Sequence, residues 1–276
     1  MSRTEHAQGK EVTILVPNFR TPDITRICFR LIRKHTDPAR VHVIAIDNDS
    51  GDASLDYLRS LNWIELIERR VELPEPPPLS HSRALDAALE RVRTPYVLSI
   101  HTDTFVKRSD WLDVLLDPFL SDPLVAGVGS WKLESKSRLE RFGRRLEQMW
   151  KVGVFRITGR RGYRAERFDP ALHYLRSHCA MYRMDVIRAL RTGFSDEEEV
   201  AGSVMHRKMV AAGYRMVFLE SAQLGRYVDH VNHATMVLNP ELGMMAKTIR
   251  TGNRRIQAKL RGIDAGGILA DDSLDA

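Results

Sequence analysis

The chain has few cysteines and no long apolar runs. No run of apolar residues approaches the roughly 20 that a membrane-spanning helix needs. Residues 1–10 are polar and lack the apolar core of a signal peptide. The only cysteines, Cys28 and Cys179, lie among apolar neighbours, which is typical of reduced core residues and not of a disulfide framework. These absences predict a cytoplasmic protein, with room for a peripheral position on the inner face of the membrane.

The composition is that of a globular, basic protein. Hydrophobic residues make up 43% of the 276 residues, which is enough for a sizeable core. The formal net charge is +6 and the pI is about 9.4. A basic surface favours anionic partners, a class that includes nucleotides, phospholipids, polyanionic glycans and nucleic acid.

Apolar runs and amphipathic segments alternate along the chain. The sequence predicts strands at 12–16, 41–46, 64–67, 96–100, 124–130, 178–182 and 215–219. It predicts helices at 21–35, 54–60, 81–93, 111–120, 184–190 and 200–212. In the first half the two kinds of element strictly alternate, which indicates an α/β fold with a mainly parallel central sheet flanked by helices.

Four segments fall outside this alternation. Residues 74–78 are proline-rich and predict a stiff, polyproline-like connector. Residues 135–167 are rich in Lys and Arg and are interpreted as an inserted helix and loop that could hold an anionic acceptor or a membrane face. Residues 244–260 predict a basic amphipathic helix, which either rests on anionic lipid or docks on the protein surface. The end of the chain, from 262, is expected to be a loose tail.

His101 and Asp103 come directly after the buried run at 96–100. Residues two apart in an extended segment point to the same side, so the imidazole and the carboxylate would face one spot. Open α/β sheets bind their ligands at this place, just past the end of a strand. A carboxylate and an imidazole suit a divalent cation and the phosphates that it carries. The alternative is a surface loop with two chance polar residues.

Three more polar clusters have both a functional and a structural interpretation. Residues 47–52 end a buried strand and either bind a ligand or form an Asx-type turn with a helix cap. Residues 196–199 supply clustered carboxylates or simply complement the dipole of the helix that follows. His230 and His233 are three residues apart, so a helical turn would put both on one face as metal ligands or as a partly exposed polar pair.

Several of these features occur in a characteristic order. They are the segments 14–17, 46–52, 100–103, 196–199 and 213–215. That order resembles the nucleotide-sugar-dependent glycosyltransferases of the GT-A fold, a Rossmann-like nucleotide-diphospho-sugar transferase fold. The likeness is strongest to the large inverting family that includes bacterial rhamnosyl- and galactosyltransferases. It covers about residues 11–240, with a nucleotide-binding half at 11–130 and an acceptor and catalytic half at 131–240. Residues 1–10 would be a flexible N-terminus.

The resemblance implies roles for residues that match the family pattern. Pro17 and Asn18 would lie beside the nucleobase. Asp47 and Asp49 would accept hydrogen bonds from the base or the ribose, since a carboxylate offers several acceptor sites. Arg83 would lie near the nucleotide, although it also has the ordinary interpretation of a solvated charge on a helix.

The segment His101-Thr102-Asp103 falls where the family carries an Asp-x-Asp motif, with His in the first position. The resemblance implies that Asp103 is a direct ligand of Mn²⁺ or Mg²⁺, which would be held against the diphosphate. Thr102 would contact the nucleotide sugar, and His101 would either contact its ribose or phosphate or complete the metal shell. A histidine from the C-terminal region would complete the metal site, with His230 preferred and His233 second.

An inverting transfer also needs a carboxylate that takes the proton of the acceptor hydroxyl. The usual Glu-Asp pair falls here on Ala201 and Gly202, so the expected base is Glu199, followed by Glu198. Like-charge neighbours would raise the pKa of a clustered carboxylate, which suits a base that works near neutral pH.

The sequence thus predicts a metal-dependent glycosyltransferase that moves a sugar from a nucleoside-diphosphate sugar to an acceptor hydroxyl with inversion, in glycan, polysaccharide or glycolipid biosynthesis. The acceptor would be a glycan, a lipid-linked molecule or a small molecule, and no nucleic acid is expected as a partner. One alternative is a degenerate nucleotide-sugar-binding protein. The other is a sugar nucleotidyltransferase, which usually needs a glycine-rich loop after the first strand, where this chain has residues 17–20 without glycine.

Overall fold

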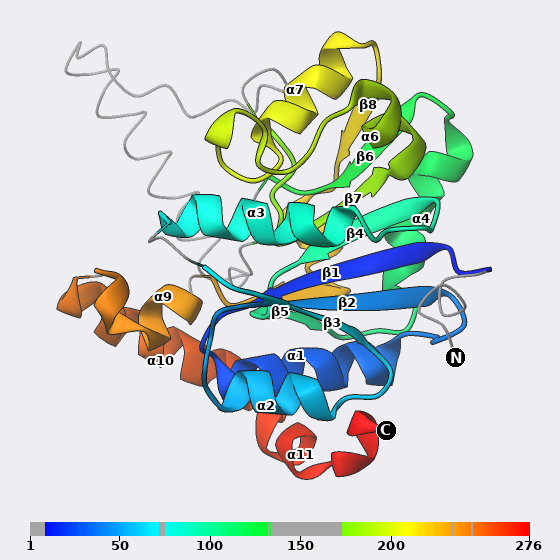
Figure 1. The fold of residues 1–276 in the computed structure, drawn as a ribbon. Helices are drawn as coiled ribbons and strands as arrows, with labels where there is room; N and C mark the ends of the chain where they lie inside the picture. Colours follow the sequence, from blue (N-terminus) through cyan, green and yellow to red (C-terminus); the bar gives the residue numbers. More distant parts are fainter. Residues whose placement is uncertain (1–8, 72–74, 132, 134–172, 233, 244) are drawn as a thin grey trace, which may run out of the picture.

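The computed structural model describes residues 9–71, 75–131, 133, 173–232, 234–243 and 245–276 (Figure 1). The predicted insertion at 135–167, the N-terminal residues 1–8 and His233 lie outside the described residues. No helix of the described residues is long and apolar enough to cross a membrane.

A seven-stranded sheet forms the centre of the protein, with strand order β3-β2-β1-β4-β7-β6-β8. The strands are β1 (Val12–Asn18), β2 (Val41–Asn48), β3 (Glu65–Arg69), β4 (Tyr96–Ile100), β6 (Val125–Gly129), β7 (Cys179–Arg183) and β8 (Arg215–Phe218). Neighbouring strands are parallel except at β7, which runs antiparallel to both β4 and β6. The prediction of a mainly parallel sheet is therefore confirmed.

Helices cover both faces of this sheet (Figure 1). The longer ones are α1 (Pro22–His35), α2 (Ala53–Ser60), α3 (Pro77–Leu89), α4 (Trp111–Ser121), α6 (Met184–Leu190), α7 (Ser203–Ala211) and α10 (Ala246–Gly262). Alternate residues of β1 point to opposite faces, so Ile14 packs in the core under α1, α2 and α4, and Leu15 in the core under α3, α6 and α7. Because both faces are covered, every residue of β2 is buried.

α3 begins at Pro77, four residues before the predicted start at 81. The proline-rich stretch at 74–78 was expected to be a connector, and its last two residues instead form the first turn of the helix. Proline fits there because the first helical N–H groups have no partner within the helix. This correction carries His81 from the predicted start of the helix into its second turn.

A second, two-stranded sheet lies past the end of β4. Its strands β5 (Thr104–Val106) and β9 (Val228–His230) are antiparallel, and Thr104 is paired with His230. The expectation of a helical turn at His230 is therefore wrong, because this residue ends a strand. Three-residue strands give almost no periodic signal in a sequence, so their pairing could not be predicted.

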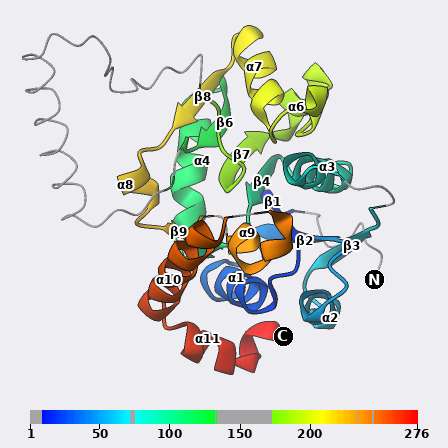
Figure 2. The ribbon, with the colours of Figure 1, turned by 90° about the vertical axis from the view of Figure 1, so that its left-hand side faces the viewer.

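The end of the chain is folded, which corrects the expectation of a loose tail. The helices α8 (Ser221–Leu224), α9 (Ala234–Leu238) and α11 (Ala265–Ala270) complete the C-terminal region, and Figure 2 shows α10 and α11 beside α1. Arg30 of α1 is only 1% exposed and explains this docking. Its Nε donates to Asp275 Oδ1 at 2.9 Å, and its guanidinium also donates to the carbonyls of Ile268 and Leu269.

Replacement of Arg30 by Ala is expected to detach this C-terminal segment. The change removes the ion pair of Asp275, which keeps its hydrogen bond from Tyr57, and leaves two carbonyl groups without this donor, at a cost of roughly 3 kcal/mol in the free energy of unfolding. Urea unfolding measures this loss. Lys34→Ala, which removes an exposed cation of the same helix, should change the free energy by less than about 0.5 kcal/mol. Equal stability of the two variants would contradict a structural role for Arg30.

Candidate functional site

A cavity of about 1120 Å³ opens at the edge of the sheet where β1, β2 and β4 end. It is lined by residues 17–20 from β1 and its following loop, 48–49 from the end of β2, 101–103 after β4, and 176–178 before β7. The start of β7 lies on the same edge as the ends of its neighbours because β7 is antiparallel to them. The cavity thus collects side chains from segments that are far apart in the sequence.

The Asp103 carboxylate is the most enclosed charge of the cavity, since this residue is only 4% exposed. Its Oδ2 accepts the backbone N–H of Ala234 at 3.0 Å, and its Oδ1 lies 3.1 Å from Nε2 of His230 and 3.8 Å from Nδ1 of His101. Burial alone would raise the pKa of Asp103. The nearby imidazoles, that of His230 first, together with the Ala234 N–H outweigh burial and lower it. The carboxylate is therefore ionised at neutral pH.

Four imidazoles surround this carboxylate. The rings of His178 and His230 stack with centroids 4.7 Å apart, and the ring of His81 meets that of His101 edge-on at 4.6 Å. The hydroxyl of Ser177 lies between two of them, 3.1 Å from Nε2 of His81 and 3.0 Å from Nε2 of His101. Burial lowers the pKa of His81 to about 4 and holds the pKa values of His101 and His178 well below the usual range. These three rings are neutral at pH 7, so each keeps a nitrogen lone pair.

The donor set fits a divalent cation. His101, Asp103 and His230 each offer one ligand atom, and these three atoms lie within 4.8 Å of one another. Nδ1 of His230 is buried without a hydrogen-bond partner, and Nε2 lies 3.1 Å from the Asp103 carboxylate. A buried ring nitrogen without a partner is costly, and a cation in this cluster would draw on the same imidazole. The structure therefore brings together two of the predicted metal ligands, Asp103 and His230, and adds His101, while His233 lies outside the described residues.

The aspartates after β2 differ in their surroundings. Asp47 is buried and does not line the cavity, because its Oδ1 accepts from Asn18 Nδ2 at 2.8 Å and its Oδ2 from the N–H of Ser50 at 3.0 Å. Asp52 caps α2 through the N–H of Ser54. Asp47 and Asp52 thus have structural roles in the turn and the helix cap, as one of the two interpretations of this cluster predicted. Asp49 is exposed, lines the cavity and has a left-handed backbone with φ of 63°.

The other predicted nucleotide-binding residues divide in the same way. Pro17, Asn18 and Thr102 line the cavity. Arg83 does not line it, because its guanidinium pairs with Glu75 at 2.8 Å and Glu198 at 2.9 Å. Arg83 therefore braces the rim of the cavity.

The acidic cluster before α7 does not line the cavity either. Glu199 binds both terminal nitrogens of the Arg207 guanidinium at 2.9 Å, and neither Glu198 nor Glu199 is a lining residue. The expectation of a raised pKa is wrong for Glu199: hydrogen bonds from Arg207 and then from Ser203 lower it. Ala201, at the position of the family's usual carboxylate, does line the cavity.

Sequence reasoning missed His81, Ser177 and His178. His81 sits in a helix whose start was misplaced, and the other two directly precede β7. A polar residue at the start of a strand becomes a candidate for the site only when that strand is known to run antiparallel to its neighbours. The strand order of the sheet was thus the missing information.

Comparison with known proteins gives a family and a fold. Residues 13–191 match the family model described as Glycosyl transferase family 2, and no curated protein sequence matches the chain. A mannosyltransferase from Pyrobaculum calidifontis, solved with GDP-Man and Mn²⁺, is 17% identical, with 95% of this chain and 75% of that chain covered and a TM-score of 0.53. TarS 1–349 from S. aureus is 14% identical, with 84% of this chain covered and a TM-score of 0.50. The chain covers 63% of that TarS structure, which is less than two thirds of its length. These likenesses confirm the predicted GT-A fold.

The cluster of two imidazoles and one carboxylate is expected to bind Mn²⁺ in the absence of any other ligand. Loss of one ligand in Asp103→Ala or His230→Ala should weaken binding by at least about 10-fold, the loss that even outer partners of metal ligands cause. Titration followed by the electron paramagnetic resonance of free Mn²⁺ measures the affinity. Asp117→Asn, at an exposed carboxylate of α4, serves as the control. Unchanged affinity in both ligand variants would show that the cluster is not a metal site.

Proposed function

The chain belongs to glycosyl transferase family 2, and from this premise we propose that it transfers a sugar from a nucleoside-diphosphate sugar to an acceptor hydroxyl with the help of a divalent cation. One observation carries the proposal. An ionised carboxylate and two imidazoles, those of Asp103, His101 and His230, converge in the cavity at the carboxyl edge of the parallel strands. Ligands of open α/β sheets bind at such an edge.

The order of the strands suggests how the donor lies in the cavity. β2 and β1 contribute the nucleoside end, β4 the cation site, and β7 and β6 the opposite end. Four strand spacings of about 4.8 Å give roughly 19 Å from β2 to β6, which is enough for an extended nucleotide sugar and part of an acceptor. The nucleoside, the diphosphate and the transferred sugar would follow one another along this edge.

Asp49 is the best-placed acceptor of hydrogen bonds from the ribose or the base, because it is exposed and lines the cavity. Asp47 would act indirectly through its hydrogen bonds to Asn18 and Ser50, which fix the turn that carries Asp49. Pro17 and Thr102 would shape the walls. A role for Arg83 in nucleotide binding would likewise be indirect, through Glu75.

The ligands favour Mn²⁺ over Mg²⁺. Mg²⁺ prefers oxygen ligands and retains its waters, whereas imidazole nitrogen suits transition metals. The Mn²⁺ in the mannosyltransferase structure supports the same choice. A bound cation would offset the charge that develops on the departing nucleoside diphosphate. The protein's own contribution is a preorganised set of donors, since His101 is oriented by Ser177 and Asp103 by the Ala234 N–H.

The proton acceptor and the stereochemical course remain predictions. Among the described lining residues the carboxylates are Asp49, Glu75 and Asp103. Burial would raise the pKa of Glu75, but hydrogen bonds from Arg69 and Arg83 lower it to about 2, so it is a poor base.

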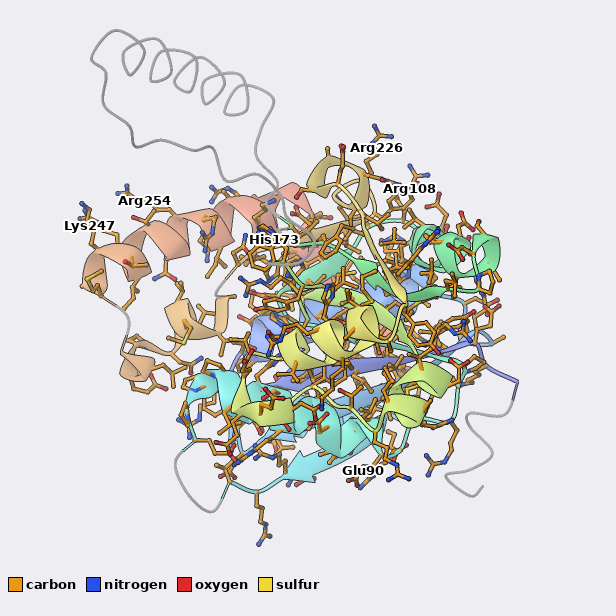
Figure 3. The ribbon with its side chains drawn as sticks, turned by 90° about the horizontal axis from the view of Figure 1, so that it is seen from above. Glu90, Arg108, His173, Arg226, Lys247 and Arg254 are labelled. Carbon is orange, nitrogen blue, oxygen red and sulfur yellow. The ribbon has the colours of Figure 1, made fainter. Side chains whose placement is uncertain are left out.

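We propose inversion on the family likeness alone. The pathway, the acceptor class and peripheral membrane contact also remain predictions; Lys247 and Arg254 of α10 point outward in Figure 3.

Turnover of a donor panel tests the proposal. UDP-, GDP-, dTDP- and CDP-sugars are incubated with Mn²⁺, Mg²⁺ or a chelator, and nucleoside diphosphate release is measured. One donor class should be turned over, faster with Mn²⁺ than with Mg²⁺, and Asp103→Ala should slow it by at least about 100-fold. Asp117→Asn should match the wild type. Binding of a donor without any turnover would favour the degenerate binding protein, and release of pyrophosphate from a nucleoside triphosphate would favour the nucleotidyltransferase.

Glu199→Gln tests the predicted base. Because Glu199 pairs with Arg207 outside the cavity, the change should reduce the rate of transfer by less than about 5-fold, whereas loss of a working general base costs 10²–10⁴-fold. Rates at saturating donor and a thermal unfolding control are the measurements. A loss of more than about 100-fold in a folded variant would restore Glu199 to the catalytic role.

A further inference from the structure

The guanidinium of Arg176 lies against two aromatic rings, which meet each other edge to face, at one end of the cavity. Its central carbon lies 4.3 Å from the ring centroid of Trp131 and 4.9 Å from that of Tyr174, and all three residues line the cavity. The backbone is fixed as well, because the Arg176 N–H donates to the Ser130 carbonyl at 3.0 Å and the preceding Leu175 is fully buried. This cation is therefore preorganised by contacts that leave its charge in place.

No carboxylate of the described residues pairs with Arg176. Other partly buried arginines of this region are neutralised: Arg69 and Arg83 both bind Glu75, at 2.6 Å and 2.8 Å. The guanidinium donates a hydrogen bond to the Tyr174 hydroxyl, and an arginine has five N–H donors in all. These donors form a fork that matches a phosphate or a carboxylate in a bidentate way. The arrangement thus has the charge, the donors and the rigidity of an anion site.

The position of Arg176 separates this site from the nucleoside end. Ser177, the next residue, contacts His81 and His101, so Arg176 borders the cation site. Trp131 follows β6, and Arg176 precedes β7. In the order of the sheet these strands lie on the opposite side of β4 from β1 and β2, which carry Asn18 and Asp49. A donor whose diphosphate lies at Asp103 would therefore present its transferred sugar toward Arg176.

We propose that Arg176, packed against Trp131 and Tyr174, binds an anionic group of the acceptor, a phosphate or a carboxylate, and so selects acidic acceptors. The assignment of the anion to an acceptor rests on the proposed function, whereas the anion site itself rests on the geometry alone. Such an anion would fix the acceptor hydroxyl beside the cation site, since Arg176 and Ser177 are consecutive. Neutral acceptors of the same size would lack this anchor.

The test measures binding of glycerol 3-phosphate, glycerate and glycerol by calorimetry, with the protein alone and with the protein saturated with Mn²⁺ and the nucleoside diphosphate of the preferred donor. We expect the two anions to bind in both states and glycerol to bind in neither. Arg176→Gln should weaken anion binding by about 10- to 100-fold, the value of a charge-assisted pair. Arg176→Lys keeps the charge without the fork and should lie between. Arg226→Gln removes an exposed arginine that points outward in Figure 3 and is the matched control.

The outcomes separate the possible sources of the anion. Displacement of glycerol 3-phosphate by the nucleoside diphosphate would assign the site to the donor phosphates and overturn the proposal. Equal binding by the wild type and by both Arg176 variants would also overturn it. Failure of the proposed function has a different signature, in which no nucleoside diphosphate binds with Mn²⁺ while Arg176-dependent anion binding persists. If Arg176→Gln does not fold, the anion affinity of Arg176→Lys is compared with that of the wild type, because this variant retains the positive charge.

Discussion

The buried carboxylate of Asp103 is the constraint on which the site depends. It lies past the end of β4, in the middle of the sheet, and takes its hydrogen bond from Ala234 in the last third of the chain. The same contact brings β9, and with it His230, against β5. A lone carboxylate at this depth would be costly, so the imidazoles and the N–H group stabilise the charge that in turn makes the cluster suitable for a cation. The same contacts thus stabilise the buried charge and make the cluster suitable for a cation.

Much of the fold could be predicted because its signals are local. The apolar runs of β1 and β2 and the amphipathic pattern of α1 each lie within one continuous segment. The position of Asp49 follows from the end of β2, and that of Asp103 from the end of β4. The chemistry of the turn at 47–52 was also recognised, but a sequence does not show which of two aspartates turns inward. Asn18 decides this matter by binding Asp47 from another strand.

The remainder depends on contacts between distant segments. His178 and Ser177 enter the site only because β7 runs antiparallel, and Arg176 is positioned by Trp131 and Tyr174, which flank a long intervening segment. Glu199 illustrates the opposite error. Its acidic neighbours predicted a raised pKa, yet Arg207, two turns along the next helix, reverses the sign. Composition near a residue is thus a weak guide to its charge state when an arginine lies within reach in space.

The anchoring of Arg30 has a consequence for the order in which the protein matures. Arg30 and Asp275 are 245 positions apart, so this cation stays without its main partner during synthesis until Asp275 has left the ribosome. Contacts of such long range are the slowest to form. α1 packs on the face of the sheet that includes β1, which ends at Asn18, and β2, which is followed by Asp49, and its docking against the C-terminal segment is thus a late event of folding. A chain that ends before α11 would expose an unpaired arginine and the apolar side chains around it, a mark that chaperones and proteases can recognise.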